Sequence, residues 1–129
     1  MKRLALLLSL AVGAMDAVTG LLLIFTPSLV MKLLGIPALP PESQVPMEWI
    51  GVFVFSIGVS YSLTMRGRSA AETVWIFTTI VRSSVAVFLA VRIAGGALPV
   101  AWAVVAAADA TVAVVQMIGL KAGWWKDPA

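Results

Sequence analysis

Three ionisable residues lie inside long apolar stretches of this sequence: Asp16, Arg82 and Asp109. Each falls near the middle of a run of about 20 mostly apolar residues, the length that crosses the hydrocarbon core of a bilayer. A charge at that depth costs about 2.5–3.5 kcal/mol on insertion scales. Three unpaired charges would strain a protein whose total stability is on the order of 5–15 kcal/mol. We therefore expect the three side chains to face one another and not lipid.

The chemistry of the three residues permits such a cluster. A guanidinium has donors enough for two carboxylates. Counting from the ends of the two last runs sets Arg82 within about one helical turn of Asp109, and Asp16 reaches the same arginine if its helix packs beside them. Two carboxylates against one guanidinium leave one negative charge uncompensated when all are ionised. Desolvation and the like charge then favour a proton on one carboxylate.

Two interpretations of the cluster stay open on these grounds. It is a proton relay or polar ligand pocket, which intramembrane charges commonly mark, or a buried salt bridge that fixes the order and register of the helices. Further polar side chains are predicted to extend the cluster: Thr19, Ser56, Ser60, Thr78, Thr79, Ser83 and Gln116.

The composition indicates what kind of domain holds these residues. Of 129 residues, 61% are hydrophobic and 12% are charged, against about 45–50% and about 25% in average soluble domains. So short a soluble chain could not bury that much apolar surface, which predicts a single integral membrane domain. With no Cys and no His, the chain lacks thiolate or imidazole metal ligands and the commonest nucleophile–base pairs. We expect no cofactor, no metal site and no enzyme.

Four apolar stretches are long enough to span a bilayer, at residues 4–25, 47–65, 71–94 and 100–120. The predicted fold is an all-α bundle of four transmembrane helices. The start imitates a signal peptide, but its apolar run continues to Phe25, so we expect a retained first span. Thr26 and Pro27 break that span and cap a short helix over 27–34, too short to cross and so placed at the interface.

The other breaks are also specific. Ser69 and Glu72 form a Ser-x-x-Glu pattern that predicts a capping box at the start of the third span. Gly95 and Gly96 are expected to end that span, and Pro99 to open the fourth.

The basic residues predict an orientation. Six lie on the side of the amino terminus (Lys2, Arg3, Arg66, Arg68, Lys121 and Lys126) and two on the other side (Lys32 and Arg92). Because Lys and Arg are retained on the inner side, both termini are predicted to be cytoplasmic, in a multi-pass protein of the inner membrane. Two aromatic belts are expected as well, Trp49 and Trp102 outside and Tyr61, Trp75, Trp124 and Trp125 inside. The basic pI of about 9.8 is explained by these helix-end charges, without a nucleic-acid partner.

The last two spans read IVRSSVAVFLAVRIAGGALPVAWAVVAAADATVAVVQ. An arginine early in one span, a Gly-Gly-x-x-Pro turn and an aspartate in the next resemble the small bacterial four-helix membrane proteins of the DoxX-like kind, as does LLGIP after the first span. The resemblance implies a four-helix membrane bundle, with Arg82 and Asp109 as a signature pair, and no particular activity. The small multidrug resistance family also has an acidic residue in its first helix. It uses Glu there, however, and balanced Lys and Arg, and its pattern has neither the proline-rich loop nor Arg82.

The sequence therefore predicts a small non-enzymatic membrane protein, an accessory or assembly subunit or a scaffold. The alternative is an oligomeric proton-coupled transporter or small-molecule binder that uses Asp16, Arg82 and Asp109. The expected partners are the lipid bilayer and either a larger membrane complex or further copies of the chain.

Overall fold

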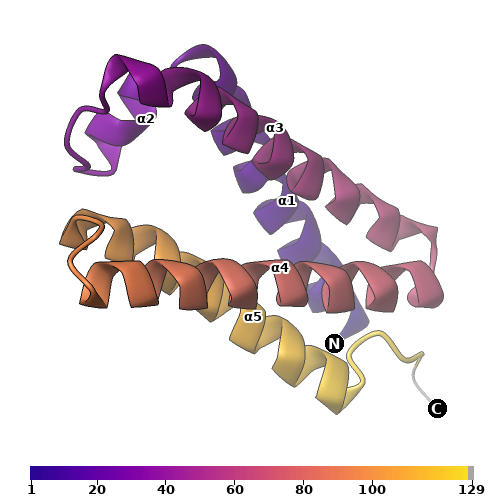
Figure 1. Ribbon diagram of the computed structural model, residues 1–129. Coiled ribbons are helices and arrows are strands. Elements are labelled where there is room, and N and C mark those ends of the chain that lie inside the picture. Colours follow the sequence, from indigo (N-terminus) through magenta and orange to yellow (C-terminus); the bar gives the residue numbers. More distant parts are fainter. Residues whose placement is uncertain (128–129) are drawn as a thin grey trace.

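The computed structural model describes residues 1–127, which contain helices and connections but no strand (Figure 1). Its α-helices are α1 (Lys2–Phe25), α2 (Pro27–Leu33), α3 (Gln44–Ser60), α4 (Arg68–Ala94) and α5 (Ala103–Ala122). Short 3-10 segments extend them: η1 (Pro41–Ser43), η2 (Tyr61–Arg66) and η3 (Val100–Trp102). With these extensions, four helices of the described chain are long and apolar enough to cross a membrane. The predicted all-α fold class is confirmed.

The first connection turns at the predicted proline. Pro27 takes the first position of α2, where its missing N–H leaves no hydrogen bond unmade. Thr26 is the N-cap residue of α2, as predicted. Its hydroxyl makes no capping bond and donates back to the Leu22 carbonyl at 2.9 Å. The helix ends at Leu33, one residue before the predicted end. Gly35 follows the C-cap, and its φ of 70° lets the Ile36 amide donate to the Met31 carbonyl at 2.9 Å.

The predicted capping box at Ser69 and Glu72 is wrong. Helix α4 begins at Arg68 with Gly67 as its N-cap residue, so Ser69 lies inside the helix, and no side chain caps it. The Glu72 carboxylate instead accepts a hydrogen bond from the Arg68 guanidinium at 2.8 Å. A charged donor four residues earlier on the same helix face is a stronger partner for a carboxylate than a backbone amide.

The second span is not a uniform α-helix. From Tyr61 it tightens into the 3-10 segment η2, and two hydroxyls bond backbone carbonyls three residues back: Ser60 to Ile57 at 2.6 Å, and Thr64 to Tyr61 at 2.7 Å. Such local bonds compete with the regular helical ladder. The change of pitch determines the direction of Tyr61, the first residue of η2.

The bundle consists of two helix pairs. Helix α1 packs along α3, and α4 packs along α5, while η2 connects the pairs by contacting both α1 and α4. In Figure 1 the pairs lie close together on the side of the chain termini and diverge toward the left, where α2 lies. Lys2 and Asp127 form an ion pair at 2.6 Å, so the two ends of the described chain are neighbours.

Backbones meet directly between α1 and α3. A Cβ atom on Gly20 would lie 2.4 Å from the Phe55 amide nitrogen, and one on Gly58 would lie 2.4 Å from the Ala17 nitrogen. Gly13 and Gly51 are equally crowded by the facing helix. Small residues permit this approach in lipid, where helices associate through close packing.

Two apolar clusters close the ends of the bundle. At the termini end, Ala5, Tyr61, Ala71, Val74, Trp75 and Trp125 are buried together. At the α2 end, the buried cluster contains Leu23, Val30, Met31, Ile36 and Met47, with Trp102 packed against it. Each cluster joins residues from both helix pairs, and the candidate site lies between the clusters.

The predicted inner aromatic belt is wrong for three of its members. Tyr61, Trp75 and Trp125 are 1%, 1% and 2% exposed. The rings of Trp75 and Trp125 meet edge to face, with centroids 5.2 Å apart. These large rings fill the space where the helix pairs converge, so packing and not the membrane interface determines their position. Trp49, predicted for the other belt, is 66% exposed.

Candidate functional site

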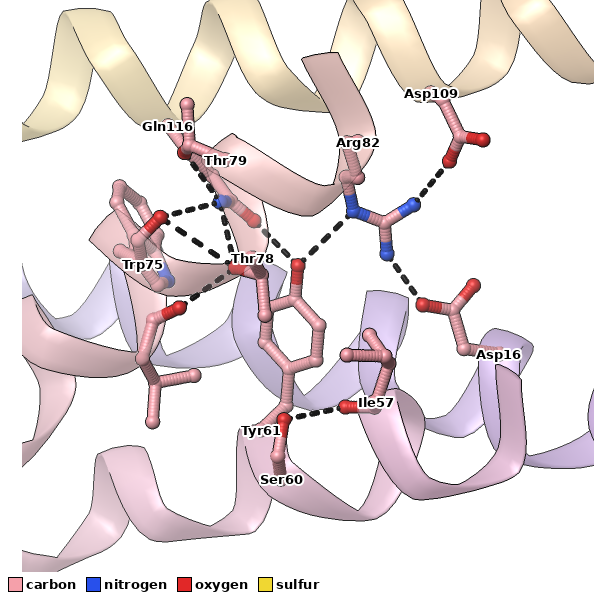
Figure 2. A network of polar contacts seen from close by, with 11 residues as sticks. Asp16, Ile57, Ser60, Tyr61, Trp75, Thr78, Thr79, Arg82, Asp109 and Gln116 are labelled. Carbon is pink, nitrogen blue, oxygen red and sulfur yellow. Dashed lines mark hydrogen bonds and ion pairs between the residues drawn. The ribbon is translucent and has the colours of Figure 1, made fainter. Parts of the chain in front are cut away.

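The site is centred on Arg82, which is 5% exposed and lies in the middle of α4. All three nitrogens of its guanidinium are hydrogen-bonded (Figure 2). One terminal nitrogen donates to Asp109 Oδ1 at 2.7 Å and the other to Asp16 Oδ2, while Nε donates to the Tyr61 hydroxyl at 3.2 Å. We call these four residues the Arg82 cluster. They come from α1, η2, α4 and α5.

Local helix geometry aims each partner inward. Asp16 lies on the buried face of α1, between Gly13 and Gly20, so the contact that seats α1 against α3 also fixes the direction of its carboxylate. Asp109 projects from α5, which packs antiparallel to α4 after the Gly95–Gly96 turn. Tyr61 arrives through the 3-10 turn of η2. The structure thus brings together the three charges, as their depths in the sequence favour.

A second polar centre lies beside the first. The Gln116 side-chain oxygen accepts from the Tyr61 hydroxyl at 2.5 Å. The Gln116 nitrogen lies 2.9 Å from the hydroxyls of Thr78 and Thr79 and 3.1 Å from the Trp75 carbonyl. Tyr61 therefore connects the two centres, accepting from Arg82 and donating to Gln116.

The hydrogen bonds continue toward the termini end. The Trp75 indole nitrogen donates to the Ser9 hydroxyl at 2.7 Å, and Ser9 donates to the Ala5 carbonyl at 2.8 Å. Because Ser9 belongs to α1 and Trp75 to α4, this bond joins the two helix pairs a second time. The polar seam thus extends from the middle of the bundle to the cluster at its end.

Only part of the predicted polar set takes part. Thr78, Thr79 and Gln116 are buried and belong to the seam. Ser56 is exposed and Ser60 half-buried, and their hydroxyls bond carbonyls of their own helix. Thr19 and Ser83 are half-buried and join none of the bonds described above.

Sequence reasoning missed three members: Ser9, Tyr61 and Trp75. A signal existed for two of them. Ser9 lies seven residues before Asp16, and Trp75 seven before Arg82, a spacing that returns to nearly the same helix face. For Tyr61 no such spacing exists, because the 3-10 segment η2 changes the helical periodicity at this residue.

The charges of the Arg82 cluster lie in a mostly buried, hydrogen-bonded setting. Its guanidinium has no free nitrogen, and the side chains of Asp16 and Asp109 are only 13% and 18% exposed. Charge-assisted bonds in such surroundings are strong, and their loss would leave a charge without compensation. Among the described residues, no group of three His, Cys, Asp or Glu side chains is arranged to hold a metal ion.

Comparisons with family models, with curated proteins and with solved structures gave no match to this chain. The resemblance to DoxX-like proteins therefore stays a prediction. The geometry of the site shows that one arginine on α4 binds residues of the three remaining spans: α1, α3 with its extension η2, and α5.

Proposed function

We propose that this chain is a small non-enzymatic membrane protein, an accessory or assembly subunit or a scaffold, in which the Arg82 cluster is a structural lock. The single observation that carries the proposal is the saturation of Arg82. Its three guanidinium nitrogens bind partners on α1, η2 and α5, so this arrangement of the helices satisfies all of them at once.

A lock of this kind addresses a specific problem of small membrane bundles. Lipid is as apolar as the helix surfaces, so burial of apolar side chains does not by itself select which helix meets which. A charge in lipid is costly, and an arrangement that leaves Arg82 or an aspartate unpaired is penalised. The cluster thereby selects one helix order, the use of buried ion pairs that we favour here.

The outer surface of α5 supports a partner in the membrane. Ala103, Ala107 and Ala110 are exposed on this helix, and small side chains allow another helix to approach closely. We infer that a second membrane protein or another copy of the chain packs against this side. The distribution of Lys and Arg favours cytoplasmic termini in the inner membrane.

The orientation has a direct test, because the chain contains no cysteine. A single cysteine replacing Lys126 should be labelled by a membrane-impermeant maleimide only after the cells are opened, whereas one replacing Ala38 should be labelled in intact cells. The reverse pattern would overturn the orientation.

One observation favours a second candidate, an oligomeric proton-coupled carrier or binder. Two carboxylates share one guanidinium, and each uses a single oxygen in these bonds. The Asp109 side chain keeps 18% of its surface exposed. A proton that entered there would neutralise Asp109 and weaken its hold on Arg82.

One experiment separates the two candidates. The protein is extracted gently from its own membrane, weighed by native mass spectrometry, and also reconstituted for pH-dependent uptake measurements. A defined partner subunit, or a homo-oligomer without uptake, would support the scaffold. If the reconstituted protein shows pH-dependent uptake, and Asp109→Asn abolishes this uptake without changing the mass of the oligomer, the scaffold proposal is overturned in favour of the carrier. Asp127→Asn, which removes a carboxylate far from the cluster, is the matched control.

A further inference from the structure

A pocket of about 350 Å³ lies at the α2 end of the bundle, away from the Arg82 cluster. Its lining residues belong to helix α2, the loop after it, η1 and the first residue of α3. The lining combines apolar side chains with polar ones: Pro27, Met31, Ile36, Leu39, Lys32 and Gln44. The chemistry of the walls therefore suits a molecule with both an apolar and a polar part.

The pocket is preformed by the backbone around it. Gly35 adopts a φ of 70° and closes α2 through the bond from the Ile36 amide to the Met31 carbonyl. Both of those side chains are anchored in the buried cluster of the α2 end. Pro40 and Pro41 restrict the loop opposite, since proline fixes φ. A site that is already ordered costs little entropy to occupy.

Lys32 gives the pocket its charge. The side chain is exposed at the end of α2 and makes no ion pair within the described residues. The acidic residues of this part of the chain are Glu42 and Glu48, and neither lines the pocket. Glu48 instead accepts a hydrogen bond from Gln44 at 3.4 Å. The pocket thus presents one positive charge that forms no ion pair with a carboxylate of the described residues.

The surroundings of the pocket indicate where its occupant comes from. Phe25, at the end of the candidate span α1, is 76% exposed, and Leu29 and Leu33 on the adjoining α2 are 45% and 71% exposed. Large apolar side chains exposed at such a level lie in the boundary between headgroups and acyl chains. A lipid headgroup is therefore the nearest abundant anion, with its hydrocarbon beside these three residues.

We propose that this pocket binds an anionic phospholipid, with the Lys32 ammonium paired to the headgroup phosphate and the apolar side chains of Leu39, Pro40 and Pro41 covering the glycerol and first acyl carbons. A single lysine near an anionic headgroup gives a modest preference. The proposal goes beyond the scaffold function and does not depend on it, since the pocket shares no residue with the Arg82 cluster.

The test is native mass spectrometry of the intact chain in mild detergent with equal amounts of phosphatidylglycerol and phosphatidylcholine. Wild type should retain phosphatidylglycerol preferentially, and Lys32→Gln should reduce that preference about fivefold. Arg92→Gln is the matched control, because Arg92 lies at the same end of the bundle but packs over the Phe88 ring, 5.6 Å from its centroid. Its preference should equal that of wild type.

A second variant tests the pocket itself and not only its charge. Ala38 lines the pocket and is exposed, so Ala38→Trp should fill the space and displace the lipid while Lys32 stays in place. The proposal requires a reduced preference for phosphatidylglycerol in Lys32→Gln and a loss of its retention in Ala38→Trp. No change in either variant, or an equal loss in Arg92→Gln, would overturn it. Displacement of the lipid by glycerol 3-phosphate at equal concentration would overturn it too, because the site would then bind a soluble phosphate.

Discussion

Helix α1 packs closely along α3 but reaches α4 mainly through side chains, and these two contacts are built in opposite ways. Against α3 it presents Gly13 and Gly20, and the backbones touch without any polar side chain between them. Toward α4 it presents Ser9 and Asp16, which bond Trp75 and Arg82 across a wider spacing. Both are solutions to association in lipid, where close packing and interhelical hydrogen bonds replace the hydrophobic effect. An added side-chain atom at a glycine should destabilise the contact between α1 and α3. Removal of a hydrogen-bonding group should destabilise the contact between α1 and α4.

The largest loss of stability is expected when Arg82, the centre of the polar contact, is replaced. Arg82→Met removes the one cation and leaves the carboxylates of Asp16 and Asp109 buried and unpaired, which should cost about 3–5 kcal/mol. The measurement is the free energy of unfolding in mixed micelles of mild detergent and dodecyl sulfate. Neutralising the partners as well, in Asp16→Asn/Arg82→Met/Asp109→Asn, should recover much of the loss. A triple variant as unstable as the single one would contradict the role of charge.

The glycine contact should be next in size. Gly58→Ala places a Cβ atom 2.4 Å from the Ala17 nitrogen, so α1 and α3 must separate, at about 1–3 kcal/mol for overpacking. Gly95→Ala is the control, since its added atom meets only the carbonyl of its own helix at 3.3 Å. The same unfolding titration compares them. Equal stability of the two variants would mean that α1 and α3 are not held at this distance.

A smaller effect is expected from the residue that connects the two polar centres. Tyr61→Phe keeps the buried ring but removes the hydroxyl that accepts from Arg82 and donates to Gln116. The expected loss is about 1 kcal/mol, the net value of a typical hydrogen bond. Ser56→Ala removes an exposed hydroxyl that bonds its own helix, and it should leave the unfolding free energy within about 0.5 kcal/mol of wild type. A loss in Ser56→Ala as large as in Tyr61→Phe would contradict this assignment.

The smallest effect concerns the surface bond at the termini end. Lys2 donates to Asp127 and lowers the pKa of that carboxyl below its ordinary value. A depressed pKa in the folded state adds stability above the ordinary pKa, and that stability is lost as the pH falls through the folded value. Thermal unfolding of wild type and Asp127→Asn should therefore differ slightly at neutral pH and converge in acid. A gap that persisted in acid would show that the ion pair is not its cause.

Hydropathy and backbone chemistry alone predicted the elements of this protein. Four apolar runs, the break at Pro27 and the turn at Gly95 and Gly96 all follow from local properties, namely the length that spans a bilayer and the φ angles that proline and glycine permit. The depth of Asp16, Arg82 and Asp109 follows from the same counting. The capping-box prediction was wrong because the Arg68 guanidinium, and not a backbone amide, donates to the Glu72 carboxylate.

Which faces meet was decided only by the tertiary structure. In a soluble helix the apolar side points inward, but here exposed residues such as Leu7 and Val18 are as apolar as the buried Leu23, so the pattern does not reveal the inward side. The glycine contact between α1 and α3 and the burial of Trp75 and Trp125 therefore could not be predicted from hydropathy. Tyr61 shows the same limit, since the pitch of η2 and the position of α5 together bring its hydroxyl between Arg82 and Gln116.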